Sequence, residues 1–198
     1  MHIEELAWKT VDPNDMWVFD KLILSTKLGY DCGPVGIPVN KPGKYIVRPA
    51  VNALGLGLGA SIEYIKDSTD HLTPGHFWCE IFHGRHLSVD YHRGLQVLCV
   101  EGSKSADTFT HWNRWQRTKD YVNRPSLLMP FLQRYEWVNC EYIDGNLIEV
   151  HLRRNVDFDG DDIDEFIPVW KGEDTTPPEG YKYKEYPDVH GRIGAFIK

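Results

Sequence analysis

The chain has 198 residues, 41% of them hydrophobic and 13% aromatic, which excludes an intrinsically disordered protein. Its formal net charge of −7 disfavours a protein that coats nucleic acid through a basic surface. None of its four Cys falls in a C-x-x-C pair, and no apolar run approaches the length of a membrane span. We therefore expect a reduced, soluble protein of the cytoplasm that has no membrane partner.

The first predicted element is a helix that begins near Pro13, behind Asp12 as its N-cap, and ends near Gly29. A loop rich in Gly and Pro follows it, and residues 44–51 have the composition of a strand. The next segment, residues 52–61, carries glycines at alternate positions. A backbone of this kind can approach phosphate closely, although an ordinary flexible turn explains the glycines equally well.

The middle of the chain is predicted to form an antiparallel meander. Residues 77–82 and 86–91 are apolar runs separated by His83-Gly84-Arg85, and we expect them to pair as neighbouring strands. Residues 95–102 continue the meander as a third strand. Two predicted helices follow: residues 108–122 and residues 126–135, the second shortened by Pro130.

The clearest hairpin signal is Asp144-Gly145, which lies between two strand-like runs within residues 137–153. Side chains at alternate positions of a strand share a face, so Glu149, His151 and Arg153 project together. This row combines a carboxylate, an imidazole and a cation. Together with the other strands and helices, the hairpin favours an α+β fold built on antiparallel sheets.

The strand register decides whether Glu141 joins this row. A two-residue turn sets Glu141 opposite Ile148, so that Glu141 and Glu149 face opposite sides of the sheet. A three-residue loop, or a bulge, sets Glu141 directly opposite Glu149, where two carboxylates can share Mg²⁺. On spacing alone, a solvated strand face with a Glu–Arg pair is the simpler interpretation.

Two segments combine aromatic and basic residues, a composition that can serve nucleic-acid binding. Trp112 and Trp115 lie close to Arg114 and Arg117, and residues 181–186 alternate Tyr with Lys. On an acidic chain we interpret the first segment as buried tryptophans and the second as an amphipathic strand. Nucleic acid is therefore not an expected partner.

The order of the segments resembles the ATP-grasp superfamily from about Asp20 to about Arg153. The succession is FDKL on a helix, a loop ending GIPV, IVRP before the glycine-rich loop, CEIFHGRHLSVDY and CEYIDGNLIEVHLR. The resemblance implies a single ATP-grasp-like domain over residues 1–198, with α+β architecture. It also implies a nucleotide cleft between two small lobes, residues 12–75 with the glycine-rich loop and residues 76–198 with the metal site.

The resemblance implies roles for individual residues. The residues that match nucleotide-binding positions are Lys21, Arg48, Gly55, Gly57, Glu80, Phe82 and His86. Glu141 and Glu149 match the two acidic metal ligands of the family, and His151 stands where the family usually has a metal-binding Asn. Arg153 matches the arginine of the signature E-x-N-x-R and is the implied catalytic residue. Arg48 also departs from the family, which usually has Lys there.

The activity that the resemblance implies is that of a Mg-ATP-dependent ligase. Such an enzyme activates a carboxylate, on a small molecule or a peptide, as an acyl phosphate that an amine or thiol then attacks. The cofactors would be ATP and Mg²⁺. The family's N-terminal domain has no counterpart before Lys21, so a protein partner is expected to supply that part of the substrate site. The alternatives are a non-catalytic nucleotide-binding module of a larger assembly and, less favoured, a nucleic-acid-associated protein.

Overall fold

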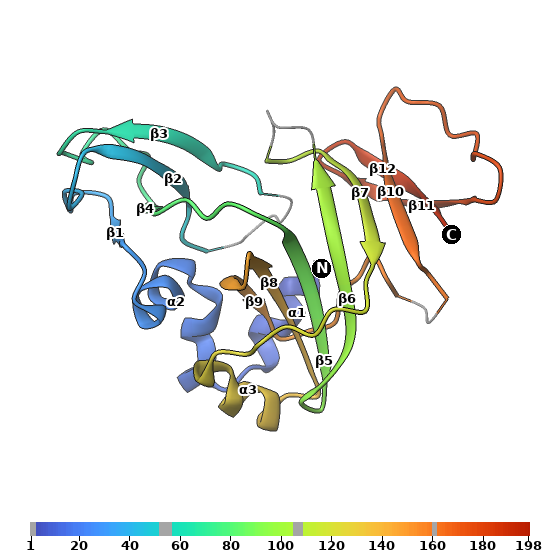
Figure 1. Ribbon diagram of the computed structural model, residues 1–198, viewed down its shortest axis with the longest axis horizontal. Helices are drawn as coiled ribbons and strands as arrows, with labels where there is room; N and C mark the ends of the chain where they lie inside the picture. Colours follow the sequence, from blue (N-terminus) through green and yellow to red (C-terminus); the bar gives the residue numbers. More distant parts are fainter. Residues whose placement is uncertain (1–2, 52–56, 105–108, 160–161) are drawn as a thin grey trace.

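The computed structural model describes residues 3–51, 57–104, 109–159 and 162–198 (Figure 1). Two antiparallel sheets dominate it, and few helices accompany them, so the predicted α+β class is confirmed. The helical segments are α1 (Ile3–Thr10), the 3₁₀ helix η1 (Pro13–Phe19), α2 (Lys21–Leu28), the 3₁₀ helix η2 (Ser126–Leu128) and α3 (Met129–Arg134). No helix in these ranges is long and apolar enough to cross a membrane.

The strands divide between the two sheets in chain order. The four-stranded sheet has the order β1-β4-β2-β3 and contains β1 (Cys32–Pro34), β2 (Gly43–Pro49), β3 (Ser61–Ile65) and β4 (His76–Cys79). The eight-stranded sheet has the order β11-β12-β10-β7-β6-β5-β8-β9. Its strands are β5 (His86–His92), β6 (Leu95–Lys104), β7 (Trp112–Arg117), β8 (Trp137–Ile143), β9 (Asn146–His151), β10 (Glu165–Trp170), β11 (Lys182–Val189) and β12 (Arg192–Ile197).

The helix predicted over residues 13–29 is two elements that meet at Asp20. Asp12 caps η1, and the Asp20 carboxylate accepts from the backbone N–H groups at the start of α2. Gly29 ends α2 with a φ of 78°. The N–H of Lys21 donates to the carbonyl of Ala50 at 2.7 Å, so the first residue of α2 is fixed beside the end of β2.

The prediction that residues 77–82 and 86–91 pair with each other is wrong. β4 pairs with β1 and β2, whereas β5 pairs with β6 and β8 in the other sheet. Residues 80–85 form the linker that crosses between the sheets. A Cβ at Gly84 would lie 2.7 Å from the Cβ of Asp144, and its φ is 132°, so the linker needs a glycine to pass the β8–β9 turn. The two runs resemble a hairpin because both are aromatic and apolar.

The prediction of a helix over residues 108–122 is also wrong, since this region contains β7. The strand pairs with β6 on one side and with β10 on the other. Hydrogen bonding to two neighbours in a large sheet outweighs the local helical pattern. In contrast, the helix predicted over residues 126–135 is confirmed as η2 and α3, with Pro130 in the first turn of α3.

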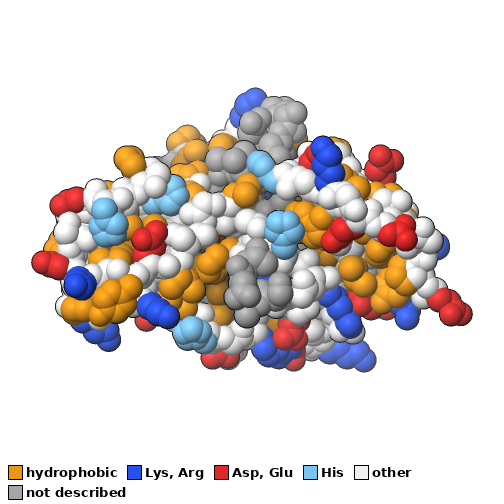
Figure 2. Space-filling view, turned by 90° about the horizontal axis from the view of Figure 1, so that it is seen from above, with side chains coloured by type: hydrophobic (Ala, Val, Ile, Leu, Met, Phe, Trp, Pro, Cys, Tyr) orange, Lys and Arg blue, Asp and Glu red, His pale blue; other side chains and the backbone are white. Residues whose placement is uncertain are grey.

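Alternation along the strands gives the eight-stranded sheet one apolar face and one polar face at its β5–β8–β9 end. Val89, Tyr91, Cys140 and Tyr142 pack into a core with α1, η1, α2 and α3, which cover this end of the sheet (Figure 1). The side chains that alternate with them face away from the helices. Figure 2 views the molecule from above Figure 1, the side opposite these helices, and there charged side chains of both signs are interspersed with hydrophobic ones.

Candidate functional site

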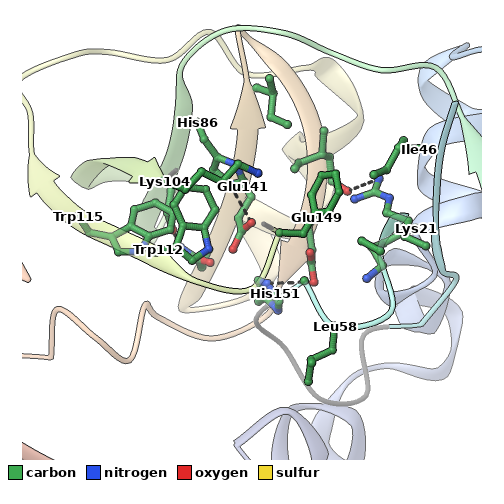
Figure 3. A pocket seen from close by; sticks show the side chains of 18 of the residues that line it. Lys21, Ile46, Leu58, His86, Lys104, Trp112, Trp115, Glu141, Glu149 and His151 are labelled. Carbon is green, nitrogen blue, oxygen red and sulfur yellow. Dashed lines mark hydrogen bonds and ion pairs between the residues drawn. The ribbon is translucent and has the colours of Figure 1, made fainter. Parts of the chain in front are cut away.

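A cavity of about 770 Å³ lies between the two sheets (Figure 3). The start of α2, strand β2 and the linker line one part of it, and β5, β7, β8 and β9 line another. It brings together ten of the residues implied by the family resemblance: Lys21, Arg48, Gly57, Glu80, Phe82, His86, Glu141, Glu149, His151 and Arg153. Gly55 lies outside the described residues.

A β-bulge places the two carboxylates opposite each other. The turn at Asp144-Gly145 has two residues and pairs Ile143 with Asn146, which alone would separate the two carboxylates. The register shifts by one residue within the hairpin, so that Tyr142 pairs with Leu147 but Glu141 pairs with Glu149. Ile148 is the extra residue. Both carboxylates therefore face the cavity, as the register with a bulge predicts.

His86 holds the carboxylate of Glu141. Its Nε2 lies 3.0 Å from Oε2 of Glu141, across the β5–β8 pair. Burial by itself raises the pKa of Glu141, but the hydrogen bond and charge of His86, together with the charges of His151 and Arg153, outweigh burial and hold the pKa at about 2. Glu141 therefore stays ionised. The structure thus places His86 against a predicted metal ligand.

Lys21, which is buried, and Arg48, which is half-buried, provide two cations in the cavity, and Figure 3 shows Lys21 on the side of the carboxylates away from His86. Lys21 is only 6% exposed, and burial lowers its pKa although the charge of Glu149 opposes this effect. Burial likewise lowers the pKa of Arg48. The Nη2 of Arg48 donates to the carbonyl of Ile148 at 3.2 Å, and its buried Nε has no hydrogen-bond partner among the described residues. Such a donor needs an acceptor, and an anion in the cavity would supply one.

The linker is anchored at the segment between α2 and β1. The carboxylate of Glu80 accepts from the N–H of Asp31 at 2.9 Å, and the N–H of Glu80 donates to the carbonyl of Asp31 at 2.8 Å. The ring of Phe82 packs edge-on against Tyr30, with centroids 4.7 Å apart. These contacts fix the conformation of the linker where it lines the cavity.

A buried polar network supports the segment that carries Arg153, and the sequence analysis missed it. Both carboxylate oxygens of Asp90 accept from the N–H of Asn155 at 3.0 Å, and Nδ2 of Asn139 donates to Asp90 at 2.8 Å. Burial raises the pKa of Asp90, although these hydrogen bonds act against it. The signal in the sequence is the alternation of Ser88 and Asp90 with apolar residues along β5, which marks a polar face.

The donor set fits Mg²⁺ in one particular way. In the part of the chain that the structure describes, no group of three or more His, Cys, Asp or Glu residues is arranged to hold a metal by itself. Mg²⁺ is ordinarily bound by one or two carboxylates together with substrate phosphates and water, which Glu141 and Glu149 can satisfy. The Nε2 of His151 lies 3.4 Å from Oε1 of Glu149, so this imidazole contacts a predicted ligand.

Similarity to solved structures identifies the fold. No protein-family model matches the sequence, and no curated protein matches it. A putative ATP-grasp superfamily protein from Archaeoglobus fulgidus has a TM-score of 0.50 and 16% identity, over 91% of this chain and 63% of that chain. An L-amino acid ligase from Bacillus licheniformis has a TM-score of 0.49 and 11% identity, over 91% and 66% of the two chains. The ATP-grasp ligase PsnB complexed with a minimal precursor has a TM-score of 0.44 and 13% identity, over 73% and 54%.

The protein therefore has the ATP-grasp fold, and the predicted resemblance is confirmed at the level of architecture. The chain spans about 63% of the length of the Archaeoglobus protein to which it is similar.

Proposed function

We propose that the chain binds Mg-ATP in the cavity between the two sheets and is an ATP-dependent ligase that activates a carboxylate. One observation carries this proposal: two carboxylates paired across a bulged hairpin share a cavity with the cations Lys21 and Arg48 within an ATP-grasp fold. In this proposal residues 1–198 act as one domain, with the nucleotide between a lobe of about residues 12–75 and a lobe of about residues 76–198.

In this proposal each residue contacts the part of Mg-ATP that its chemistry suits. Lys21 and Arg48 would neutralise the phosphates, and the backbone near Gly57 would lie over them. Glu141 and Glu149 would hold Mg²⁺. The linker at Glu80–Phe82 would contact the base, because its backbone lines the cavity where the two sheets join.

The proposed reaction is a phosphoryl transfer followed by an acyl transfer. When bound, Mg-ATP would supply the γ-phosphoryl group: a carboxylate oxygen bonds to phosphorus as the bond to ADP breaks, and an amine or thiol then displaces phosphate from the acyl carbon and loses its proton. Arg153 lines the cavity and would stabilise the charge on the transferred group. His86 would act through Glu141 by holding its carboxylate ionised and in place.

A non-catalytic nucleotide-binding module is the second candidate, and one observation favours it. Imidazole is a poor ligand for Mg²⁺, and His151 stands where an oxygen ligand is usual for the family. A partner that contributes part of the substrate site would reconcile this candidate with the ligase.

Calorimetry with Mg-ATP tests the nucleotide site. We expect Lys21→Met and Glu149→Gln each to weaken binding by about 10- to 100-fold, because each removes a charge-assisted contact worth about 1.5–3 kcal/mol. Lys27→Met is the matched control, since Lys27 is an exposed lysine on the same helix. Absence of Mg-ATP binding by the folded wild-type protein would refute the proposal.

Hydroxylamine trapping separates the two candidates. A ligase forms ADP and a hydroxamate when a carboxylate, Mg-ATP and hydroxylamine are supplied together, since hydroxylamine intercepts the acyl phosphate. Binding of Mg-ATP without hydroxamate from any of a panel of carboxylates, with and without a candidate partner, would favour the non-catalytic module.

A further inference from the structure

Two indole rings form a wall of the cavity, and a second β-bulge puts them there. Trp115 pairs with Gly102, but Lys104 pairs with Trp112, so Asn113 is an extra residue in β7. The bulge turns both tryptophans to the face of the sheet that lines the cavity. Their ring centroids are 4.4 Å apart. Both side chains are half-buried, and the wall is thus accessible from the cavity.

Gly102 makes room for both rings. A Cβ at this position would lie 2.6 Å from Trp112 and 2.8 Å from Trp115, closer than any side chain permits. The indoles therefore rest on bare backbone at the centre of the sheet. Trp170 continues the aromatic lining, and its ring is tilted by 38° against that of His111 at a centroid distance of 4.1 Å.

The indole wall adjoins the carboxylates on the side away from Lys21. The His86 ring packs edge-on against Trp112 and Trp115, with centroids 4.7 and 5.6 Å apart, and the same ring binds Glu141. Figure 3 shows the indoles on one side of Glu141 and Lys21 on the other. If the phosphates of a nucleotide lie at Lys21, a second reactant must approach from the side of the indole wall.

Lys104 gives the wall a positive charge. Its Nζ lies 4.6 Å from the ring centroid of Phe109 and 5.2 Å from that of Trp112. Among the described residues Lys104 forms no ion pair with an acidic group. A cationic ligand would compete with Lys104 for the ring faces and be repelled by it, whereas an anionic ligand with an apolar group satisfies both the ammonium and the indoles.

We propose that this wall binds the carboxylate substrate and selects a carboxylic acid that carries an aromatic or large apolar group. The inference rests on the proposed function, because that function supplies the need for a carboxylate beside Glu141. The apolar group packs on Trp112 and Trp115, and Lys104 attracts the negative charge. Aromatic pairs of this kind add to the burial of apolar area, so the preference over a small substrate is large.

Calorimetry with three probes tests the selection, in the presence of Mg²⁺ and a non-hydrolysable ATP analogue. N-acetylphenylalanine carries both features, N-acetylglycine lacks the apolar group, and N-acetylphenylalanine amide lacks the charge. We expect the first to bind at least about tenfold more tightly than either of the others. Equal affinity for N-acetylglycine and N-acetylphenylalanine would overturn the proposal, as would tighter binding of the uncharged amide.

Variants locate the site. We expect Trp112→Ala to weaken N-acetylphenylalanine by about tenfold or more, Trp112→Phe to restore most of the affinity, and Lys104→Met to abolish the preference for the acid over the amide. The matched control is Trp137→Ala, because Trp137 stacks on His92 on the same sheet and does not line the cavity. Unchanged affinity in folded Trp112→Ala would refute the location.

Binding of the ATP analogue alone, measured separately in each variant, distinguishes a failure of the substrate inference from a failure of the proposed function. If the analogue binds but no apolar acid does, the substrate inference fails and the nucleotide site stands. If the analogue does not bind to the wild-type protein, the proposed function fails first. Trp112→Ala must keep its affinity for the analogue, since a general loss would indicate damage to the fold and would also overturn the assignment of Trp112 to the acid.

Discussion

Replacing Glu141 by Gln should remove a specific part of the acid sensitivity of the protein. The pKa of Glu141 falls from an ordinary value of 4.5 to about 2 in the folded protein. At about 1.4 kcal/mol for each pKa unit, this corresponds to about 3 kcal/mol of stability. Because the folded-state pKa is depressed, the contribution is present above pH 4.5 and is lost as the pH falls toward 2. About 2 kcal/mol should be lost by pH 3.

Urea unfolding followed by tryptophan fluorescence measures this effect in the wild type and in Glu141→Gln at pH 6 and pH 3. The difference in free energy of unfolding between the two proteins should shrink by about 2 kcal/mol from the higher to the lower pH. Glu136→Gln is the control, since Glu136 is exposed and pairs with His92 and Arg93 at the surface, where solvent screens the lowering of its pKa. Its difference should change little with pH. A difference for Glu141→Gln that stays constant between the two pH values would refute the role assigned to His86.

Two further substitutions test the supports of the site. Gly102→Ala should destabilise the protein by about 1–3 kcal/mol and shift the tryptophan emission, because the new methyl group overlaps both indoles. Thermal unfolding measures the loss of stability, and Gly43→Ala is the control for a glycine in a strand. Asn139→Ala should cost about 1–3 kcal/mol at pH 7 by urea unfolding, because Asp90 loses a donor. Because burial raises the pKa of Asp90, its carboxylate becomes protonated as the pH is lowered, and the deficit in the free energy of unfolding should shrink. A deficit that grew would contradict this account.

The parts of the site that depend on local sequence were predictable. Asp144-Gly145 specifies a tight turn by backbone conformation, with φ values of 48° and 80°, so the hairpin follows from two residues. The order of Lys21, Arg48 and the hairpin along the chain was enough to indicate the fold. The register of the hairpin was not predictable, because a bulge depends on how the whole sheet twists and pairs.

Long-range pairing explains the predictions that failed. Strand β7 lies between β6 and β10, and β10 begins at Glu165, far along the chain from Trp112. Local propensity contains no information about such a neighbour. The same limit applies to the linker at Gly84, whose tight fit against Asp144 arises only after the two sheets are assembled. The indole wall was consequently interpreted as buried core.

The extra residue in β9, Ile148, connects the eight-stranded sheet to the four-stranded sheet. Ile148 sets Glu149 on the same face as Glu141, and the carbonyl of Ile148 accepts from Arg48 in the other sheet. The position of Glu149 depends on the presence of one extra residue here and not on the side chain of that residue. Substitutions at Ile148 should leave the geometry intact, whereas deleting it would turn Glu149 toward the helices and withdraw the acceptor from Arg48. Alignments of distant relatives at this hairpin should therefore be judged by their gaps before their identities.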